Sequence, residues 1–268
     1  MRITRGVLIP TLLAGGIFAQ IPTAKQQAPE DLTGTWVSVV TEGWRYRMIT
    51  PPKGDYGVGT WPVPLNAEGI RATNAWDAAK DEATGEACKA YGGGGIMRIP
   101  GRVRITWQDE NTLKVEFDAG TQTRLFHFGG TPPANIQPSL QGYSAASWEM
   151  PAGGRGAPAG GGGGGTGFEI AGTPRPVNGA QNQRAGTLKV VTTHLKPGYL
   201  RKNGVPYSAS ATVTEYLNRT NESNGESWLF DTTIVEDTVY LQGPFITSEN
   251  FKHQADNAGW APSACEAR

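Results

Sequence analysis

Apolar and polar residues alternate along much of the chain after residue 95. In the stretches 102–108 and 112–118 every second side chain is apolar. A period of two is typical of a half-buried β-strand, because successive side chains point to opposite faces of the sheet. The residues 109–111, Asp-Glu-Asn, predict a turn, so we expect the two stretches to form a hairpin. Its apolar face would consist of Val103, Ile105, Trp107, Leu113, Val115 and Phe117.

The same alternation recurs at short intervals, and it predicts the fold class. Strands are expected at 31–40, 121–128, 143–150, 187–194, 210–217 and 227–237, with an exposed turn at 218–225. Many short strands separated by turn signals favour a mainly β protein. We expect an antiparallel sheet closed into a barrel, with a β-sandwich as the alternative.

One segment, 65–83, has the features of a helix. Asn66 is a good N-cap residue, and Ile70, Trp76 and Ala79 fall near one helical face. Gly85 follows as a helix-ending residue. We therefore predict one early helix in an otherwise β-rich chain.

The segment from about 151 to 186 interrupts the pattern between two predicted strands. It consists mainly of Gly, Pro, Asn, Gln and Ala, with few large apolar side chains. Such a segment buries too little surface to offset the entropy lost on ordering. Lengthening a surface loop costs only about 0.6 kcal/mol per doubling, so the sheet tolerates it. We predict a disordered insertion at the tip of a hairpin.

The N-terminus resembles a secretory signal peptide. Arg2 and Arg5 precede an uncharged run from 6 to 19, which is shorter than the roughly 20 residues of a membrane-spanning helix. We expect residues 1–19 to be a signal peptide, cleaved near Ala19 or alternatively near Ala24, although a retained anchor is the other reading. Residues 20–30 would form a flexible segment, and 31–268 a single barrel domain. The location would be periplasmic or secreted.

Charge and cysteine content narrow the partners and the redox environment. The 268 residues carry 24 basic and 24 acidic side chains without a basic stripe, which disfavours nucleic acid and anionic membrane surfaces. No further segment is expected to span a membrane stably. The two cysteines, Cys88 and Cys265, would form a disulfide after export, and two buried free thiols are the alternative.

Two resemblances emerge from the sequence. Gly-Tyr-Ser at 142–144, Trp-Glu at 148–149 and Leu-x-Val-x-Thr-Thr at 188–193 recur in this order in a group of uncharacterised secreted bacterial proteins, which this chain resembles over most of residues 95–265. That group implies no activity. More weakly, Leu-Thr-Gly-Thr-Trp at 32–36 is similar to the first strand of lipocalin and calycin barrels. This likeness implies that Trp36 closes one end of a barrel, whereas ordinary core packing is the other reading.

The candidate chemistry is sparse. The polyglycine run contains a GxGxxG only by repetition and has no strand-to-helix context, so nucleotide binding there is not expected. No cofactor or metal motif is present, and no cofactor or metal is expected. His194, Glu215 and Asp231 lie on successive predicted strands and would converge if their faces point inward. A histidine beside a carboxylate is the minimum for proton transfer, because the carboxylate fixes the tautomer of the imidazole. The alternative is a solvated outer face.

The best candidate function is the binding of a small apolar or amphipathic molecule inside the barrel. The alternative to a cavity is a core that the aromatic side chains fill. An enzyme of the hydrolase, lyase or isomerase type, using His194 with Glu215 or Asp231, is the second hypothesis. An envelope interaction module with the glycine-rich loop as its arm is the third. The candidate ligand-binding residues are Trp107, Phe117, Arg124, Trp148, Tyr199, Arg201, Trp228 and Phe230.

Overall fold

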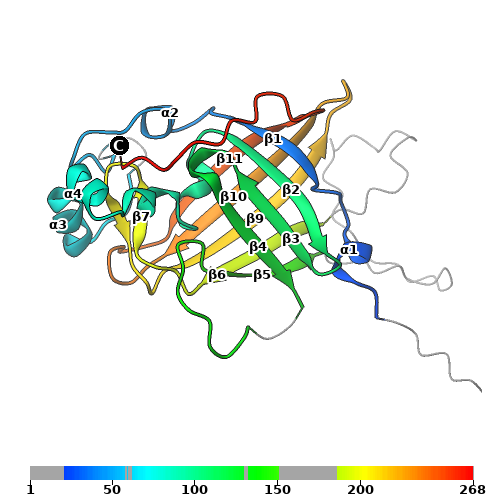
Figure 1. Cartoon of the computed structure of the whole chain (residues 1–268), viewed down its shortest axis with the longest axis horizontal. Coiled ribbons are helices and arrows are strands. Elements are labelled where there is room, and N and C mark those ends of the chain that lie inside the picture. The colour runs from blue at the N-terminus through cyan, green and yellow to red at the C-terminus, as the bar shows by residue number, and fades with distance from the viewer. Residues whose placement is uncertain (1–20, 58, 60–61, 130–131, 151–185, 268) are drawn as a thin grey trace, which may run out of the picture.

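The computed structural model describes residues 21–57, 59, 62–129, 132–150 and 186–267 (Figure 1). Within these residues, nine strands close into a barrel in the order β1-β11-β10-β9-β6-β5-β4-β3-β2. The predicted barrel is therefore confirmed, and the sandwich alternative is not. The strands are β1 (Gly34–Val39), β2 (Arg102–Asp109), β3 (Thr112–Phe117), β4 (Gln122–Phe128), β5 (Tyr143–Glu149), β6 (Thr187–Thr193), β9 (Thr212–Asn221), β10 (Ser227–Glu236) and β11 (Phe245–Gln254).

The alternation predicts most of these strands because one face of each is packed inside the barrel. β2 and β3 form the expected hairpin, and β9 and β10 pair over their whole length. β5 pairs antiparallel with β6, from Tyr143 opposite Thr193 to Glu149 opposite Thr187. The two strands thus form the hairpin expected around the insertion. The predicted disorder of that insertion concerns 151–185, which lie outside the described residues.

Two strand features differ from the prediction. β4 and β5 pair in parallel, since the chain crosses from one end of the barrel to the other between them. β11, which closes the barrel between β1 and β10, is not predicted by the alternation. Its inward positions include Thr247, Glu249 and His253, so its inner face is partly polar and lacks a clean apolar period. Because polar residues occupy inward positions of β11, the sequence does not show the apolar alternation that would predict this strand.

The predicted single helix is two helices, α3 (Ala67–Ala75) and α4 (Ala78–Ala83). Asn66 caps α3 as expected, because its side chain accepts a hydrogen bond from the Gly69 amide. Trp76 then adopts an extended backbone, and Asp77 caps a new helix by accepting from two backbone amides. A second N-cap within the segment therefore divides it.

The other elements lie at the two ends of the barrel (Figure 1). α1 (Ala24–Gln27) lies at one end, where the Trp148 indole donates to the Ala24 carbonyl. Part of the segment predicted to be flexible thus contacts the barrel. At the opposite end, which we call the helical end, lie α2, α3, α4 and a separate two-stranded sheet. The remaining bounds are α2 (Trp44–Arg47), η1 (Ala87–Tyr91), η2 (Ile96–Arg98), η3 (Ala119–Thr121), β7 (Gly198–Arg201) and β8 (Val205–Tyr207).

The barrel is filled from both ends by separate apolar clusters. Trp36, Ile105, Leu188 and their neighbours form the larger cluster toward α1, and residues such as Leu195 and Val235 form the smaller one at the helical end. The buried segment 90–97 enters this helical end. Its glycines allow close approach, because a Cβ at Gly94 would lie 2.8 Å from the Tyr207 ring.

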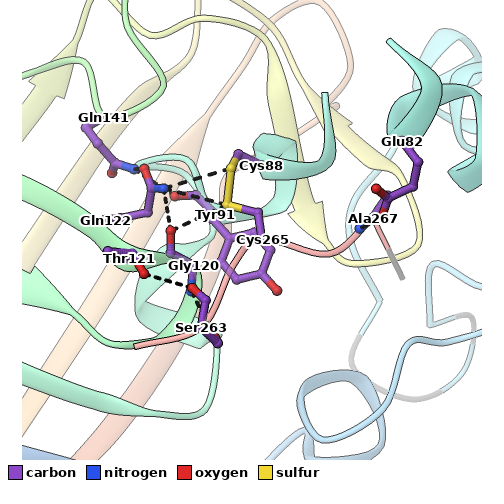
Figure 2. Close-up of a disulfide and its surroundings, with 10 residues drawn as sticks. All are labelled: Glu82, Cys88, Tyr91, Gly120, Thr121, Gln122, Gln141, Ser263, Cys265 and Ala267. Carbon is purple, nitrogen blue, oxygen red and sulfur yellow. Dashed lines mark hydrogen bonds between the residues drawn. A yellow bond between two sulfur atoms is a disulfide. The ribbon is translucent and has the colours of Figure 1, made fainter. Parts of the chain in front are cut away.

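A disulfide joins the C-terminal tail to the helical end. Cys88 and Cys265 are bonded, with their Cα atoms 5.0 Å apart, as the sequence predicts (Figure 2). The tail is also held by hydrogen bonds, because the Thr121 hydroxyl donates to the Ser263 carbonyl and the Ala267 amide donates to Glu82. The tail is thereby joined to η1, through Cys88, and to η3, through Thr121.

Candidate functional site: a buried charged layer and an end pocket

A layer of polar side chains crosses the barrel interior between the two apolar clusters. Each member lies on the inward face of its strand and is at most 5% exposed. Buried charges are costly unless they are paired, so such a layer is a candidate for function as well as for fold specificity. The layer consists of Arg124, Ser144, Thr192, Glu215, Asp231, Thr233 and Glu249.

Arg124 and Glu215 form a fully buried, bidentate ion pair. The two terminal nitrogens of Arg124 lie 2.6 and 2.5 Å from the two carboxylate oxygens of Glu215. Arg124 also donates to the Thr192 hydroxyl, which lies 2.7 Å from that of Ser144. The geometry satisfies both carboxylate oxygens of Glu215. The pair therefore serves the structure of the layer, and Arg124 is not directed at the end pocket described below.

Asp231 is the carboxyl group of this layer without a cationic hydrogen-bond partner. One of its oxygens accepts a hydrogen bond from the Thr233 hydroxyl, whereas the other is buried without a partner. Burial raises the pKa of Asp231 well above its usual range, and the nearby carboxylates of Glu215 and Glu249 raise it further. Asp231 therefore keeps its proton at pH values at which solvent-exposed Asp and Glu side chains have already lost theirs.

Replacing Asp231 by Asn should flatten the pH dependence of stability. The folded-state pKa of Asp231 lies above its unfolded value near 3.8, so the folded chain binds an additional proton in the interval between them. The free energy of unfolding therefore falls as the pH rises through that interval, and Asn has no such proton to lose. Urea unfolding at several pH values from about 4 to 8 should show a smaller loss of stability in Asp231→Asn than in the unmodified protein.

Glu236→Gln is the matched control, since Glu236 is an exposed carboxyl group at the end of the same strand. It should leave the pH dependence of unfolding unchanged. An equal pH slope for Asp231→Asn and the unmodified protein would show that Asp231 is ionised in the folded state.

Glu249 extends the charged layer toward the helical end. It lies directly opposite Asp231 in the β10–β11 register and is fully buried. Arg98 donates to one of its carboxylate oxygens at 3.2 Å, and Thr247 donates to the other. Burial raises the pKa of Glu249, and the charges of Arg98 and Arg47 oppose that rise. Glu249 thus connects the barrel interior with the pocket beyond it.

A pocket of about 140 Å³ opens at this end of the barrel. Elements far apart in the sequence form it: the start of β11, the segment around α2, η2 and the end of β7. Its wall combines an apolar part with three arginines. The lining residues are Glu42, Gly43, Arg47, Pro62, Arg98, Arg201, Phe245, Ile246, Thr247, Ser248 and Glu249.

The arginines are held by aromatic rings and backbone groups. The guanidinium of Arg201 lies 4.0 Å from the Tyr46 ring, and that of Arg98 lies 5.4 Å from the Phe245 ring. Arg47 donates from Nε to the carbonyl oxygen of Arg98. Burial lowers the pKa of Arg201 to about 10, and the like charge of Arg98 adds to this effect. The pocket therefore brings three guanidinium groups together in a largely buried site.

The structure does not bring His194 to the carboxylates. β6 ends at Thr193, and His194 is exposed with a left-handed backbone at φ 56°. The alternation that would have directed its side chain inward stops there, so its ring lies beside the Thr193 hydroxyl. Glu215 and Asp231 do point inward and share the charged layer. The geometry therefore offers no His–carboxylate pair of the kind that the sequence suggests.

The predicted ligand-binding aromatics fall into two groups. Trp107 and Trp148 both pack against Phe128, with ring centroids 5.6 and 5.3 Å away, and Phe117 belongs to the same apolar cluster. These rings fill the α1 half of the barrel. The other two, Trp228 and Phe230, alternate with the buried Leu229 and Asp231 and so lie on the outer face of β10.

The two rim residues have different surroundings. Arg201 lines the end pocket. The Tyr199 hydroxyl donates to Asp81 at 2.8 Å in a neighbouring depression that Trp76 and Lys89 also line. Sequence reasoning missed Arg47, Arg98 and Glu249. Arg47 and Arg98 lie before the region in which apolar and polar residues alternate regularly. For Glu249, the spacing of two residues from the apolar Phe251 was the one signal that it shares the inward face of a strand.

Two general findings complete the picture of the site. Within the described part of the chain, no helix is both long and apolar enough to cross a membrane, and no three His, Cys, Asp or Glu side chains are grouped to hold a metal ion. Comparison with protein-family models, curated proteins and solved structures gives no match. Fold and site thus define the class: a closed, disulfide-bonded β-barrel with a buried charged layer and an arginine-lined end pocket.

Proposed function

We propose that this is an exported barrel protein that binds a small apolar or amphipathic ligand in the end pocket. The carrying observation is the composition of the pocket, in which Phe245, Ile246 and Pro62 adjoin buried charged groups. Ligand sites commonly combine an apolar wall with a few placed polar groups. The pocket lies where β11, the segment around α2, η2 and β7 meet, so several separate elements form its walls.

Two features support export. The N-terminal sequence has the charge and length pattern of a signal peptide. The Cys88–Cys265 disulfide is of the kind that persists in oxidising compartments. Both features are expected of a periplasmic or secreted binding protein.

Protein purified from its natural host should carry a small molecule that native mass spectrometry detects. The measured mass should also equal that of a chain lacking about 19 to 24 residues, with the two cysteines oxidised. Thr247→Phe places a ring in the pocket and should abolish retention of the molecule, because the free volume is small.

Thr232→Phe is the matched control, since Thr232 lies on the neighbouring strand with its side chain on the opposite face from Asp231 and Thr233. It should retain the molecule. Repeated preparations without any bound molecule, or equal retention in both variants, would contradict ligand binding in this pocket. A full-length mass would contradict cleavage of a signal peptide.

An acid–base enzyme is the second candidate, and one observation favours it. Asp231, with its raised pKa, faces Glu249, and Glu249 lines the pocket. Perturbed carboxyl groups beside a pocket are typical of catalytic acids. In this alternative Asp231 and Glu249 take the role that the sequence suggests for His194, and conversion of the bound molecule during incubation would support it.

A further inference from the structure

We propose that the end pocket selects monocarboxylates, with the guanidinium of Arg47 binding the carboxylate and the apolar wall contacting the body of the acid. This inference rests on the proposed function and names the class of ligand. It is carried by a buried cation whose two terminal nitrogens lack hydrogen-bond partners, by the charge balance of the pocket and by the apolar residues at its mouth.

Arg47 is a pocket side chain whose hydrogen bonding is incomplete. It is only 3% exposed, and both of its terminal nitrogens are buried without a hydrogen-bond partner. Its Nε is already engaged by the carbonyl oxygen of Arg98. The two free nitrogens form the fork that matches the two oxygens of a carboxylate. Leaving such a cation unpaired is costly, so a bound oxyanion would remove the penalty.

The charge of the lining favours one negative charge on the ligand. Three arginines face two carboxylates, Glu42 and Glu249, which leaves one positive charge in excess. One of the two carboxylates, Glu249, is already paired with Arg98 at 3.2 Å. Burial lowers the pKa of Arg47 and the like charge of Arg98 adds to this effect, whereas the charges of Glu249 and Glu42 oppose it. A carboxylate balances the excess, whereas a phosphate dianion brings more negative charge than the pocket offsets.

Apolar side chains at the pocket provide a surface that the apolar part of the ligand can contact. Phe245 forms one wall, and Ile246 beside it is 56% exposed. Trp44, which follows the lining residue Gly43, is 64% exposed on α2. Exposed large apolar side chains around a charged pocket are typical of an interaction site. The enclosed volume is about that of a cavity that accepts benzene, so the acid group and the first carbons fit inside.

Isothermal titration calorimetry with octanoate, octanol and octyl phosphate tests the charge preference directly. These probes share one chain and differ in head group. The unmodified protein should bind octanoate roughly tenfold or more tightly than octanol, because a charge-assisted hydrogen bond contributes more than a neutral one. Octyl phosphate should bind more weakly than octanoate. This comparison needs no variant, so it holds even if changes at Arg47 impair folding.

Arg47→Gln should weaken octanoate binding roughly 10- to 100-fold and leave octanol binding within a factor of about three, since it removes only the cation. Arg45→Gln is the matched control on the same short helix, where Arg45 is exposed and paired with Asp55. It should bind octanoate like the unmodified protein. The melting temperatures of both variants show whether each is folded.

The outcomes separate the two proposals. Equal binding of octanoate and octanol, with Thr247→Phe abolishing both, overturns the carboxylate assignment and keeps the apolar ligand site. Tighter binding of octyl phosphate, or no effect of Arg47→Gln in a folded variant, also overturns the assignment. A failure of all three probes to bind overturns it as well, and a molecule retained from the host would then keep only the proposed function.

Discussion

Replacing Arg124 by Met should lower the free energy of unfolding by about 3–5 kcal/mol, the range for a buried ion pair that loses one partner. Arg124 and Glu215 are both fully buried and make two hydrogen bonds to each other. Without the guanidinium, the Glu215 carboxylate would remain in the barrel beside Asp231 with no cation to balance it. Urea unfolding followed by tryptophan fluorescence measures the loss.

The double variant Arg124→Met with Glu215→Leu is the decisive comparison. It removes both charges, so it should recover most of the stability that the single change loses, as replaced buried ion pairs often do. The exposed pair between Lys189 and Glu149 is a matched control on β5 and β6. Lys189→Met should cause only a small loss of stability, because an exposed ion pair contributes little. A loss of that small size for Arg124→Met would mean that water reaches Glu215.

Removing the disulfide should have an effect of similar size. The bond spans 177 positions, and the chain-entropy relation gives about 5 kcal/mol for a loop of this length. Cys88→Ser with Cys265→Ser should therefore lower the melting temperature by roughly 10–20 °C for a chain of this size. Differential scanning calorimetry of oxidised protein, reduced protein and the double serine variant measures it.

The reduced protein and the double serine variant should melt at similar temperatures if the covalent link is responsible. The tail would keep its hydrogen bonds near Ser263 and Ala267, but these are few and partly exposed (Figure 2). A shift of only a few degrees would show that these hydrogen bonds and the packing of the tail hold it without the bond. Loss of ligand binding on reduction would show that the tail also supports the pocket end.

The charged layer and the pocket are connected through one strand. β11 carries Glu249 and Thr247 on its inner face and Phe245 at the mouth of the pocket. Glu249 faces Asp231 on β10, so a change of charge in the pocket acts directly on the buried carboxyl groups of the barrel. Binding of an anion beside Arg47 and protonation of Glu249 are therefore expected to influence each other.

Regular alternation predicted the strands whose inner face is apolar. β2 and β3 are examples, because every inward residue there except Trp107 is buried. β11 was missed because Glu249 and Thr247 take inward positions, and a polar residue inside a barrel has the same sequence signature as one outside. Large aromatics are usually buried, so the sequence favours an interior position for Trp228 and Phe230. In the structure they alternate with the buried Leu229 and Asp231 and lie on the outer face.

The candidate site was predictable only in part. Glu215 and Asp231 point inward together, as the sequence allows, because both lie on strands with a clear period. His194 was grouped with them, but its strand ends one residue earlier and the backbone turns. Arg201 was identified as a rim residue, whereas Arg47 lies in a four-residue helix with no periodic signal.

The sequence by itself determined the β-rich class, the barrel, most strands, the hairpin around the insertion and the disulfide. These follow from local alternation, turn residues and a count of two cysteines, which need no knowledge of distant neighbours. Only the tertiary structure decided the pairing of β11, the Arg124–Glu215 pair and the arginine pocket. Each of these joins side chains more than 90 positions apart, or from separate elements, and such contacts depend on how the barrel closes.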